Sequence, residues 1–224
     1  MGKRLEAIGI KQVVRLEWYD FAVDMLLDGL GAKDIRSRLH AFIRERLQSG
    51  GFGERGEQTY PKAVTQIMKA WVTPEKELKE IRNHALSCAR KFPRRFWMAL
   101  HWAMTISAYP FWHRVAEQTG RLLMLQESVT QNQIRLRCFE AMGERTTVER
   151  SARRVVRSFV VWGVLEDDST KGCYVKQPPM ELPDPEMGAV LVEAVLLSKT
   201  ERMAAFDQLA GTPALFPFQL PLMT

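Results

Sequence analysis

The sequence is poor in the patterns that mark secreted, membrane-spanning and metal-binding proteins. It has only three cysteines, Cys88, Cys138 and Cys173, without CxxC or other metal-ligand spacing. We therefore expect neither a disulfide framework nor a zinc site. The first residues, MGKRLEAIGIKQ, lack the long apolar core of a signal peptide. The most apolar central run, residues 96–108, is shorter than the roughly 20 residues that a membrane span needs. These absences predict a cytoplasmic, reduced protein that has no membrane partner.

Enzyme signatures are missing from the sequence as well. Gly51-Phe52-Gly53 lacks the Gly-Lys-Ser/Thr and the preceding strand of a phosphate-binding loop. The residues that could be assembled into an acid–base group are His101, Tyr109, His113 and Glu117. His113 and Glu117 lie one helical turn apart, but no nucleophile or metal-ligand set completes the group. A histidine in an apolar helix is more often a core residue. We expect no catalytic residue, no cofactor and no metal.

What the sequence does contain is typical of a folded, mainly helical protein. Apolar residues make up 46% of the 224 residues, and six are tryptophan. Lysine and arginine exceed aspartate and glutamate by 32 − 26 = 6, which indicates an anionic partner only if the charge is clustered. Helical periodicity covers most of the first 126 residues, interrupted by a glycine-rich loop at 49–58.

The sequence changes character after residue 129. Thr130 with Gln133, and Thr146 with Glu149, have capping-box spacing. They predict two short helices, 131–142 and 147–162, joined by a tight turn. A hairpin of residues 164–166 and 173–175, closed by DDSTKG, follows. Helix, turn, helix and hairpin in this order predict a winged helix-turn-helix.

The second of these helices, 147–162, has two chemically different sides. At 100° per residue, an apolar stripe falls within about 40° of Val148. Its other members are Ala152, Val155, Phe159 and Trp162. Arg150, Arg153, Arg154 and Arg157 fall on the opposite side and are predicted to face outward together. The stretch from Gln133 to Ser158 has seven arginines and three glutamates, an excess of 7 − 3 = +4.

Arginine binds phosphate bidentately, whereas lysine acts as a point charge. We therefore take as candidate nucleic-acid-binding residues Arg145, Arg150, Arg153, Arg154, Arg157 and, on the wing tip, Lys171. Two alternatives to nucleic-acid binding stay open. The arginines could form a solvated helix face, or the winged helix could bind only protein. Glu149 would repel phosphate unless it is engaged in capping the helix.

Residues 100–167 resemble the BrxA-like family, small proteins encoded in BREX-type bacterial phage-defence loci. The resemblance rests on the Tyr109-Pro110-Phe111 step, the Gly-Glu-Arg-Thr turn at 143–146 and the arginine-rich helix ending in Trp-Gly-Val-Leu at 162–165. It implies a two-part helical protein with a first half like the NusB antitermination fold and a winged-helix part. It also implies duplex DNA binding without enzymatic activity, as an accessory to larger methyltransferase and ATPase partners.

We accordingly expect a mainly α fold: a helical N-terminal bundle (NusB-like by the resemblance) plus a winged helix-turn-helix with a short β-hairpin wing. The expected domains are residues 1–110 (helical N-terminal), 111–178 (winged helix-turn-helix) and 179–224. The last comprises helices at 185–198 and 200–209 and a proline-rich apolar tail, TPALFPFQLPLMT, packed along a groove of this chain or a neighbour.

The first functional hypothesis is an anti-phage defence component that binds double-stranded DNA and other defence proteins. The second is an interaction adaptor that uses the winged helix and the tail, which could also form a homo-oligomer. A third is RNA binding through the basic stretch Arg36 to Arg46.

Overall fold

The computed structural model describes residues 2–8, 10–48, 60–201 and 203–221. The predicted glycine-rich loop at 49–58 lies outside these ranges. The chain is mainly helical with a few short strands, as the sequence predicts. The α-helices are α1 (Gly2–Glu6), α2 (Leu16–Leu27), α3 (Ala32–Gln48), α4 (Tyr60–Ile67), α5 (Lys79–Lys91), α6 (Trp97–Ala108), α7 (Pro110–Leu123), α8 (Gln131–Met142), α9 (Thr146–Val161), α10 (Pro185–Leu197) and α11 (Phe206–Ala210).

The remaining elements are short. The strands are β1 (Ser128–Thr130), β2 (Leu165–Asp167), β3 (Cys173–Lys176), β4 (Met180–Glu181) and β5 (Phe218–Gln219). A π-helical segment (Met68–Val72) extends α4, and 3-10 turns cover Lys76–Leu78, Arg94–Phe96 and Pro213–Leu215. Within the described ranges, no helix has both the length and the apolar character needed to cross a membrane.

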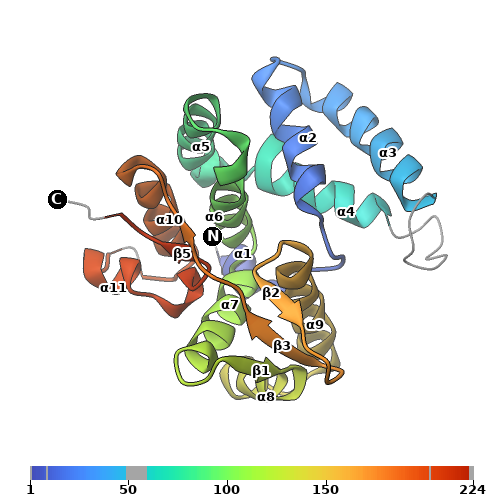
Figure 1. Cartoon of the computed structure of the whole chain (residues 1–224). Coiled ribbons are helices and arrows are strands. Elements are labelled where there is room, and N and C mark those ends of the chain that lie inside the picture. The colour runs from blue at the N-terminus through green and yellow to red at the C-terminus, as the bar shows by residue number, and fades with distance from the viewer. Residues whose placement is uncertain (1, 9, 49–59, 202, 222–224) are drawn as a thin grey trace.

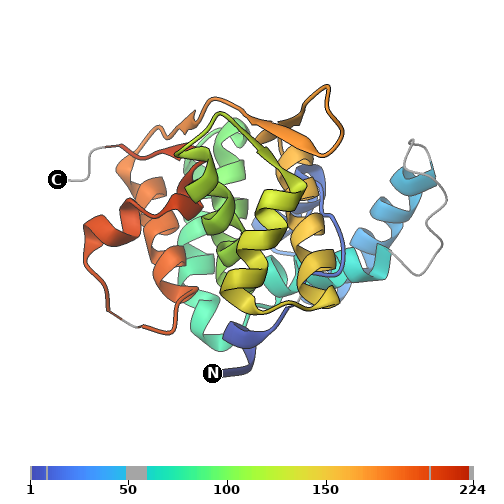
Figure 2. The same cartoon turned by 90° about the horizontal axis from the view of Figure 1, so that it is seen from below.

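The elements form three groups around α6 and α7 (Figure 1). Helices α2, α3 and α4 lie at the upper right. Helices α8 and α9 and the strands β1, β2 and β3 lie at the bottom, and α10, α11 and the C-terminal segment lie at the left. Seen from below, α8 and α9 are side by side, and α3 extends away from the rest of the chain (Figure 2).

Helix α6 is the centre of the core. Every residue from Ala99 to Ala108 is buried, so α6 is covered on all sides by the other groups. Its Trp102 lies at the middle of an aromatic cluster that draws members from α7, α9 and the C-terminal segment. These members are Trp112, Phe159, Trp162, Phe216 and Phe218. The buried side chains therefore run continuously across the predicted domain boundaries at 110/111 and 178/179, which stay predictions.

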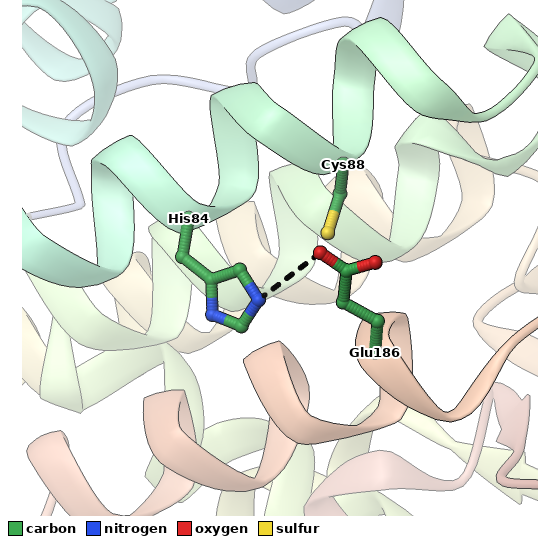
Figure 3. Close-up of side chains that lie close together, drawn as sticks. All are labelled: His84, Cys88 and Glu186. Atoms are coloured by element: carbon green, nitrogen blue, oxygen red, sulfur yellow. Dashed lines mark ion pairs between the residues drawn. The ribbon is translucent and has the colours of Figure 1, made fainter.

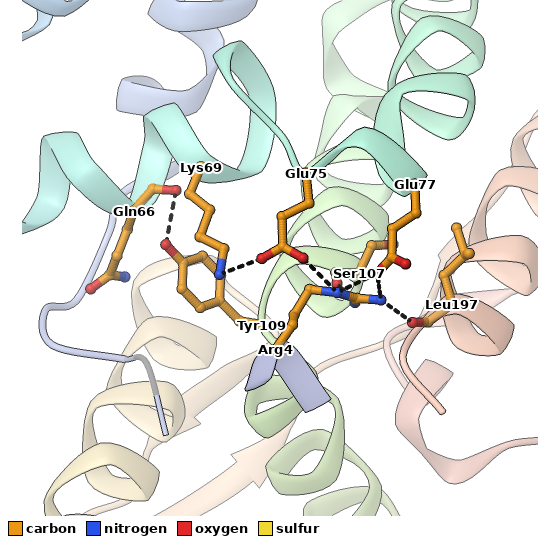
Figure 4. Close-up of polar contacts among 8 residues, drawn as sticks. All are labelled: Arg4, Gln66, Lys69, Glu75, Glu77, Ser107, Tyr109 and Leu197. Carbon is orange, nitrogen blue, oxygen red and sulfur yellow. Dashed lines mark hydrogen bonds and ion pairs between the residues drawn. The ribbon is translucent and has the colours of Figure 1, made fainter. Parts of the chain in front are cut away.

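The buried charge of Arg4 helps to fix helix α1 to the core (Figure 4). Arg4 is 4% exposed. Its Nε lies 2.9 Å from Oε1 of Glu77 and 3.4 Å from Oε2 of Glu75. Its guanidinium also donates hydrogen bonds to the carbonyl oxygens of Ser107 and Leu197, the latter at 3.0 Å. A single side chain thus joins α1, the segment before α5, the end of α6 and the end of α10.

Helix caps account for the starts of α8 and α10. The Thr130 hydroxyl accepts from the Gln133 N–H at 3.1 Å, and the Gln133 side chain accepts from the Thr130 N–H at 2.8 Å. This confirms the first predicted capping box. The Asp184 carboxylate caps α10 by accepting from the Glu186 N–H at 2.8 Å, with Pro185 at the first helical position.

The second predicted capping box is wrong. The N-cap of α9 is Arg145, which makes no side-chain capping bond, and Thr146 is already helical. The Arg145 carbonyl accepts from the N–H groups of Val148 and Glu149. The spacing of Thr146 and Glu149 matches the motif, but α9 begins one residue earlier than predicted, so Thr146 lies inside the helix and Arg145 takes the cap position. Glu149 is consequently exposed and takes no part in a capping box.

The C-terminal segment packs against α7 and β4 of its own chain, which agrees with the first of the two predicted arrangements. Its 3-10 turn, Pro213–Leu215, lies so close to α7 that a Cβ on Gly120 would stand 1.9 Å from the Pro213 carbonyl oxygen. Strand β5 then pairs in parallel with β4, and Phe218 is 7% exposed. The glycine in α7 makes this close approach sterically feasible.

The helix predicted at 200–209 is shorter than expected, because α11 begins only at Phe206. Residues 203–207 are exposed, and Met203 is 89% exposed. A short helix without a buried face gains little from its backbone hydrogen bonds alone. The helix predicted at 185–198 is confirmed as α10.

Candidate nucleic-acid interface

The region from α7 to β3 has the element order helix, strand, helix, helix, strand, strand. Its sheet has the order β1-β3-β2, with both pairings antiparallel. Val129 faces Tyr174 across β1 and β3, and both side chains are buried. The predicted helix pair and hairpin are confirmed to within a residue or two. Strand β1 was not predicted, because its three residues are too few to show an alternating pattern.

Helix α9 is anchored by the predicted apolar stripe. Val148, Ala152, Val155 and Phe159 are completely buried. Trp162, just after the helix, donates its indole N–H to the Val14 carbonyl oxygen at 2.8 Å. The stripe therefore fixes which side of α9 faces solvent, and the indole ties its end to the segment before α2.

Four of the six candidate residues are exposed. Arg150 and Arg153 lie on the first two turns of α9, three residues apart and hence on one face. Arg145 lies in the turn before α9 and donates to the Met142 carbonyl oxygen at 2.9 Å. Lys171 lies in the turn between β2 and β3.

The other two candidates correct the prediction that four arginines of α9 face outward together. Arg157 is half-buried, and its Nη1 lies 2.6 Å and 2.8 Å from the two carboxylate oxygens of Asp167 on β2. This hydrogen bond raises the pKa of Arg157. Arg154 is also half-buried, and its Nη1 lies 3.4 Å from the Ile10 carbonyl oxygen. Helical angles give a direction from the axis but do not show that the hairpin and the segment near Ile10 lie on that side.

Acidic residues also lie near the exposed arginines. Glu149 is exposed next to Arg150, and Glu144 is exposed in the turn before α9. Glu140 on α8 pairs with Arg137, with 3.2 Å between Oε2 and Nη1. The surface of α9 is therefore basic along the Arg150–Arg153 face, and Glu149 limits that basic character at the start of the helix.

Two of the residues considered for acid–base chemistry, His101 and Glu117, pair with residues outside that group. The Nε2 of His101 is 3.0 Å from Oδ1 of Asp20, and its ring stacks on Tyr19 at 5.3 Å between centroids. Tyr109 and His113 are buried, and Glu117 pairs with Arg121 at 2.8 Å. Burial lowers the pKa of both histidines. These observations agree with the interpretation of the histidines as core residues.

Sequence reasoning missed a second polar cluster, at the contact between α5 and α10. His84 and Cys88 lie one turn apart on α5, and Glu186 lies in the first turn of α10. The four-residue spacing of His84 and Cys88 was visible in the sequence. Glu186 follows almost a hundred residues later, and only the packing of α10 on α5 brings it to them.

Comparisons of the chain with protein-family models, with curated proteins and with solved structures find no match. The resemblance to the BrxA-like family therefore stays a prediction from the motifs in the sequence.

Proposed function

We propose that residues 111–178 form a winged helix-turn-helix and that this protein, without enzymatic activity, binds duplex DNA through α9. The observation that carries the proposal is the exposed pair Arg150 and Arg153 on the helix that follows the turn. The sheet order β1-β3-β2 supports it, because the last two strands then form a hairpin beside that helix.

Winged helix-turn-helix proteins place the second helix of the pair in the major groove, with its N-terminal residues toward the bases. Arg150 and Arg153 lie in the N-terminal half of α9. Arginine in this position binds phosphate oxygens or the edge of guanine bidentately. Arg145 lies in the turn before α9 and Lys171 in the turn of the hairpin that follows it, where they would contact flanking phosphates.

Arg157 and Arg154 take a different role in this proposal. Arg157 holds the hairpin against α9 through Asp167, and Arg154 contacts the segment before α2. They position the elements that carry the contacting residues. The DNA contacts therefore reduce to Arg145, Arg150, Arg153 and Lys171.

The resemblance to the BrxA-like family supports a place for this activity in bacterial phage defence, together with other defence proteins. A protein-interaction adaptor is the second candidate, and a specific surface favours it. Met124 and Leu125, after α7, are 73% and 82% exposed. They line a surface hollow together with Pro178 and Pro179. Exposed apolar side chains grouped in this way are typical of protein contacts.

The experiment is a salt titration of duplex binding by fluorescence anisotropy, with the double variant Arg150→Glu/Arg153→Glu. Each phosphate contact contributes a slope of about −0.9 to the dependence of log affinity on log salt. Losing two contacts should make the slope less steep by about 2 and reduce the affinity at 0.1 M salt by roughly fiftyfold. Glu149→Gln should strengthen binding, because it removes an exposed carboxylate next to Arg150.

The matched control is Lys79→Glu/Arg90→Glu, which makes the same change of net charge on α5. Both side chains are exposed, and α5 lies away from α9 (Figure 1). The control should keep nearly the full salt slope. Equal losses in the two double variants would mean that only net charge matters. Unchanged duplex binding by Arg150→Glu/Arg153→Glu would leave the adaptor as the better function, to be tested with Met124→Ser/Leu125→Ser.

A further inference from the structure

Three side chains with metal-binding atoms converge where α10 packs on α5 (Figure 3). They are His84 and Cys88 of α5 and Glu186 of α10, and their ligand atoms all lie within 4.8 Å of one another. The Nε2 of His84 is 3.5 Å from Oε1 of Glu186. Cys88 is fully buried, and the other two side chains are about one-third exposed. An ion could therefore reach the cluster from the side of His84 and Glu186.

The separations suit a small tetrahedral ion. Zinc bonds of 2.0 to 2.3 Å place neighbouring ligand atoms roughly 3.6 Å apart. The His84–Glu186 distance of 3.5 Å already has this value. The Cys88 sulfur needs a shift of about 1 Å at most from the 4.8 Å limit, which is within the reach of side-chain rotation.

The other ring nitrogen of His84 supplies a second observation that points to a ligand. Its Nδ1 lies 4.0 Å from Oε2 of Glu193, about two turns after Glu186 on α10. A histidine that binds a metal through one nitrogen typically directs the other N–H to a carboxylate, which fixes the ring and its tautomer. Glu193 lies on the Nδ1 side of the ring, and a shift of about 1 Å would bring its carboxylate within hydrogen-bond distance.

The charges around the cluster also favour a cation. Three carboxylates lie around it, those of Asp184, Glu186 and Glu193. The negative charge of Glu80 on α5 lies close enough to repel that of Glu193. Lys91 is the cation paired with them, 2.7 Å from Oε2 of Glu186 and 3.9 Å from Asp184. Its contact with Oε2 leaves Oε1 facing His84. One ammonium against several carboxylates leaves net negative charge for an added divalent ion.

We propose that His84, Cys88 and Glu186 bind one divalent transition metal ion of the zinc class, with water at the fourth position. An imidazole nitrogen, a thiolate and a carboxylate are ligands that Zn²⁺ takes in proteins. On binding, the Cys88 thiol releases its proton to solvent as the sulfur–metal bond forms, and the metal keeps its oxidation state. The ion would link α5 to α10, and so the N-terminal half of the chain to its C-terminal part.

The test is titration of the reduced, full-length chain with Co²⁺, a spectroscopic probe for zinc sites. We expect one Co²⁺ ion per chain and a thiolate-to-cobalt charge-transfer band in the near ultraviolet. Excess Zn²⁺ should displace the Co²⁺ and abolish the band. Cys88→Ser should abolish the band, and Glu193→Gln should weaken binding 10- to 100-fold. His84→Gln changes a partly exposed side chain, so it should leave the core intact. It should weaken Co²⁺ binding more strongly than Glu193→Gln does.

Cys138→Ser and Cys173→Ser are the matched controls, because they remove thiols of α8 and β3. Both should keep the band. Far-ultraviolet circular dichroism checks that each variant is folded. If Cys88→Ser does not fold, the proposal is tested with His84→Gln instead. The proposal is overturned if the wild type binds no stoichiometric Co²⁺, if the band survives Cys88→Ser, or if His84→Gln binds Co²⁺ as tightly as the wild type.

Discussion

The buried imidazole of His113 should make the stability of this protein depend on pH. His113 lies in α7 and is 3% exposed. Its Nε2 has no hydrogen-bond partner in the part of the chain that the structure describes. Burial, with smaller contributions from the charges of Lys199 and Arg114, lowers its pKa from 6.5 to about 3.

The direction of the effect follows from proton binding. Between pH 6.5 and 3 the unfolded chain has a protonated His113, while the folded protein keeps the ring neutral. The unfolded state then binds more protons, so the free energy of unfolding falls as the pH falls through this window. At pH 5 the loss relative to neutral pH is about 2 kcal/mol, a large part of a total of roughly 5–15 kcal/mol.

Urea unfolding followed by tryptophan fluorescence measures this loss, because all six tryptophans are buried. The variants His113→Gln and His113→Asn remove the titrating group with side chains of different size. In both, the difference in unfolding free energy between pH 7 and pH 5 should be smaller than in the wild type by about 2 kcal/mol. A change below about 0.5 kcal/mol in both variants would refute the assignment of a neutral buried ring.

Two further predictions concern how the ends of the chain are held. Arg4→Ala should lower the free energy of unfolding by about 3 kcal/mol and the melting temperature by about 6–12 °C. It leaves Glu77 and two buried carbonyl groups without their donor; a loss under about 1 kcal/mol would show that the Arg4 contacts resemble surface ion pairs. Gly120→Ala should displace the Pro213 turn and make the C-terminal segment sensitive to limited proteolysis, because the new Cβ would stand 1.9 Å from the Pro213 oxygen. Gly31→Ala, where a Cβ meets ordinary contact at 3.8 Å, is the control, and equal cleavage of the two variants would contradict this reasoning.

Local patterns in the sequence predicted the elements around α9 well. The Thr130–Gln133 box gave the start of α8, and the stripe from Val148 to Phe159 gave the buried side of α9. Both features depend only on residues within a few turns of each other, so the sequence contains all the information needed. The Thr146–Glu149 spacing failed because α9 begins one residue earlier than the motif requires, which places Thr146 inside the helix and Arg145 at its cap.

Contacts between distant segments could not be predicted in the same way. The Asp167 partner of Arg157 lies on the hairpin, and the Ile10 partner of Arg154 lies 144 residues away in the chain. A helical wheel treats both arginines as solvent-exposed, although packing brings other elements over them. For the same reason the sequence did not predict that Glu186 lies beside His84, since the cluster forms only when α10 packs on α5.

The aromatic cluster decides which perturbations can separate the proposed functions. The Trp102 ring lies 5.1 Å from Phe159 of α9, and 5.9 Å and 5.6 Å from Phe216 and Phe218 of the C-terminal segment. Removing residues 212–224 would uncover Trp102 and loosen the support of α9 at the same time. A truncated chain would therefore lose stability together with the proposed DNA binding, whether or not the tail also joins a second copy. Arg150 and Arg153 lie outside this cluster on an exposed face, so their reversal changes the proposed contact with DNA while the core that positions α9 stays intact.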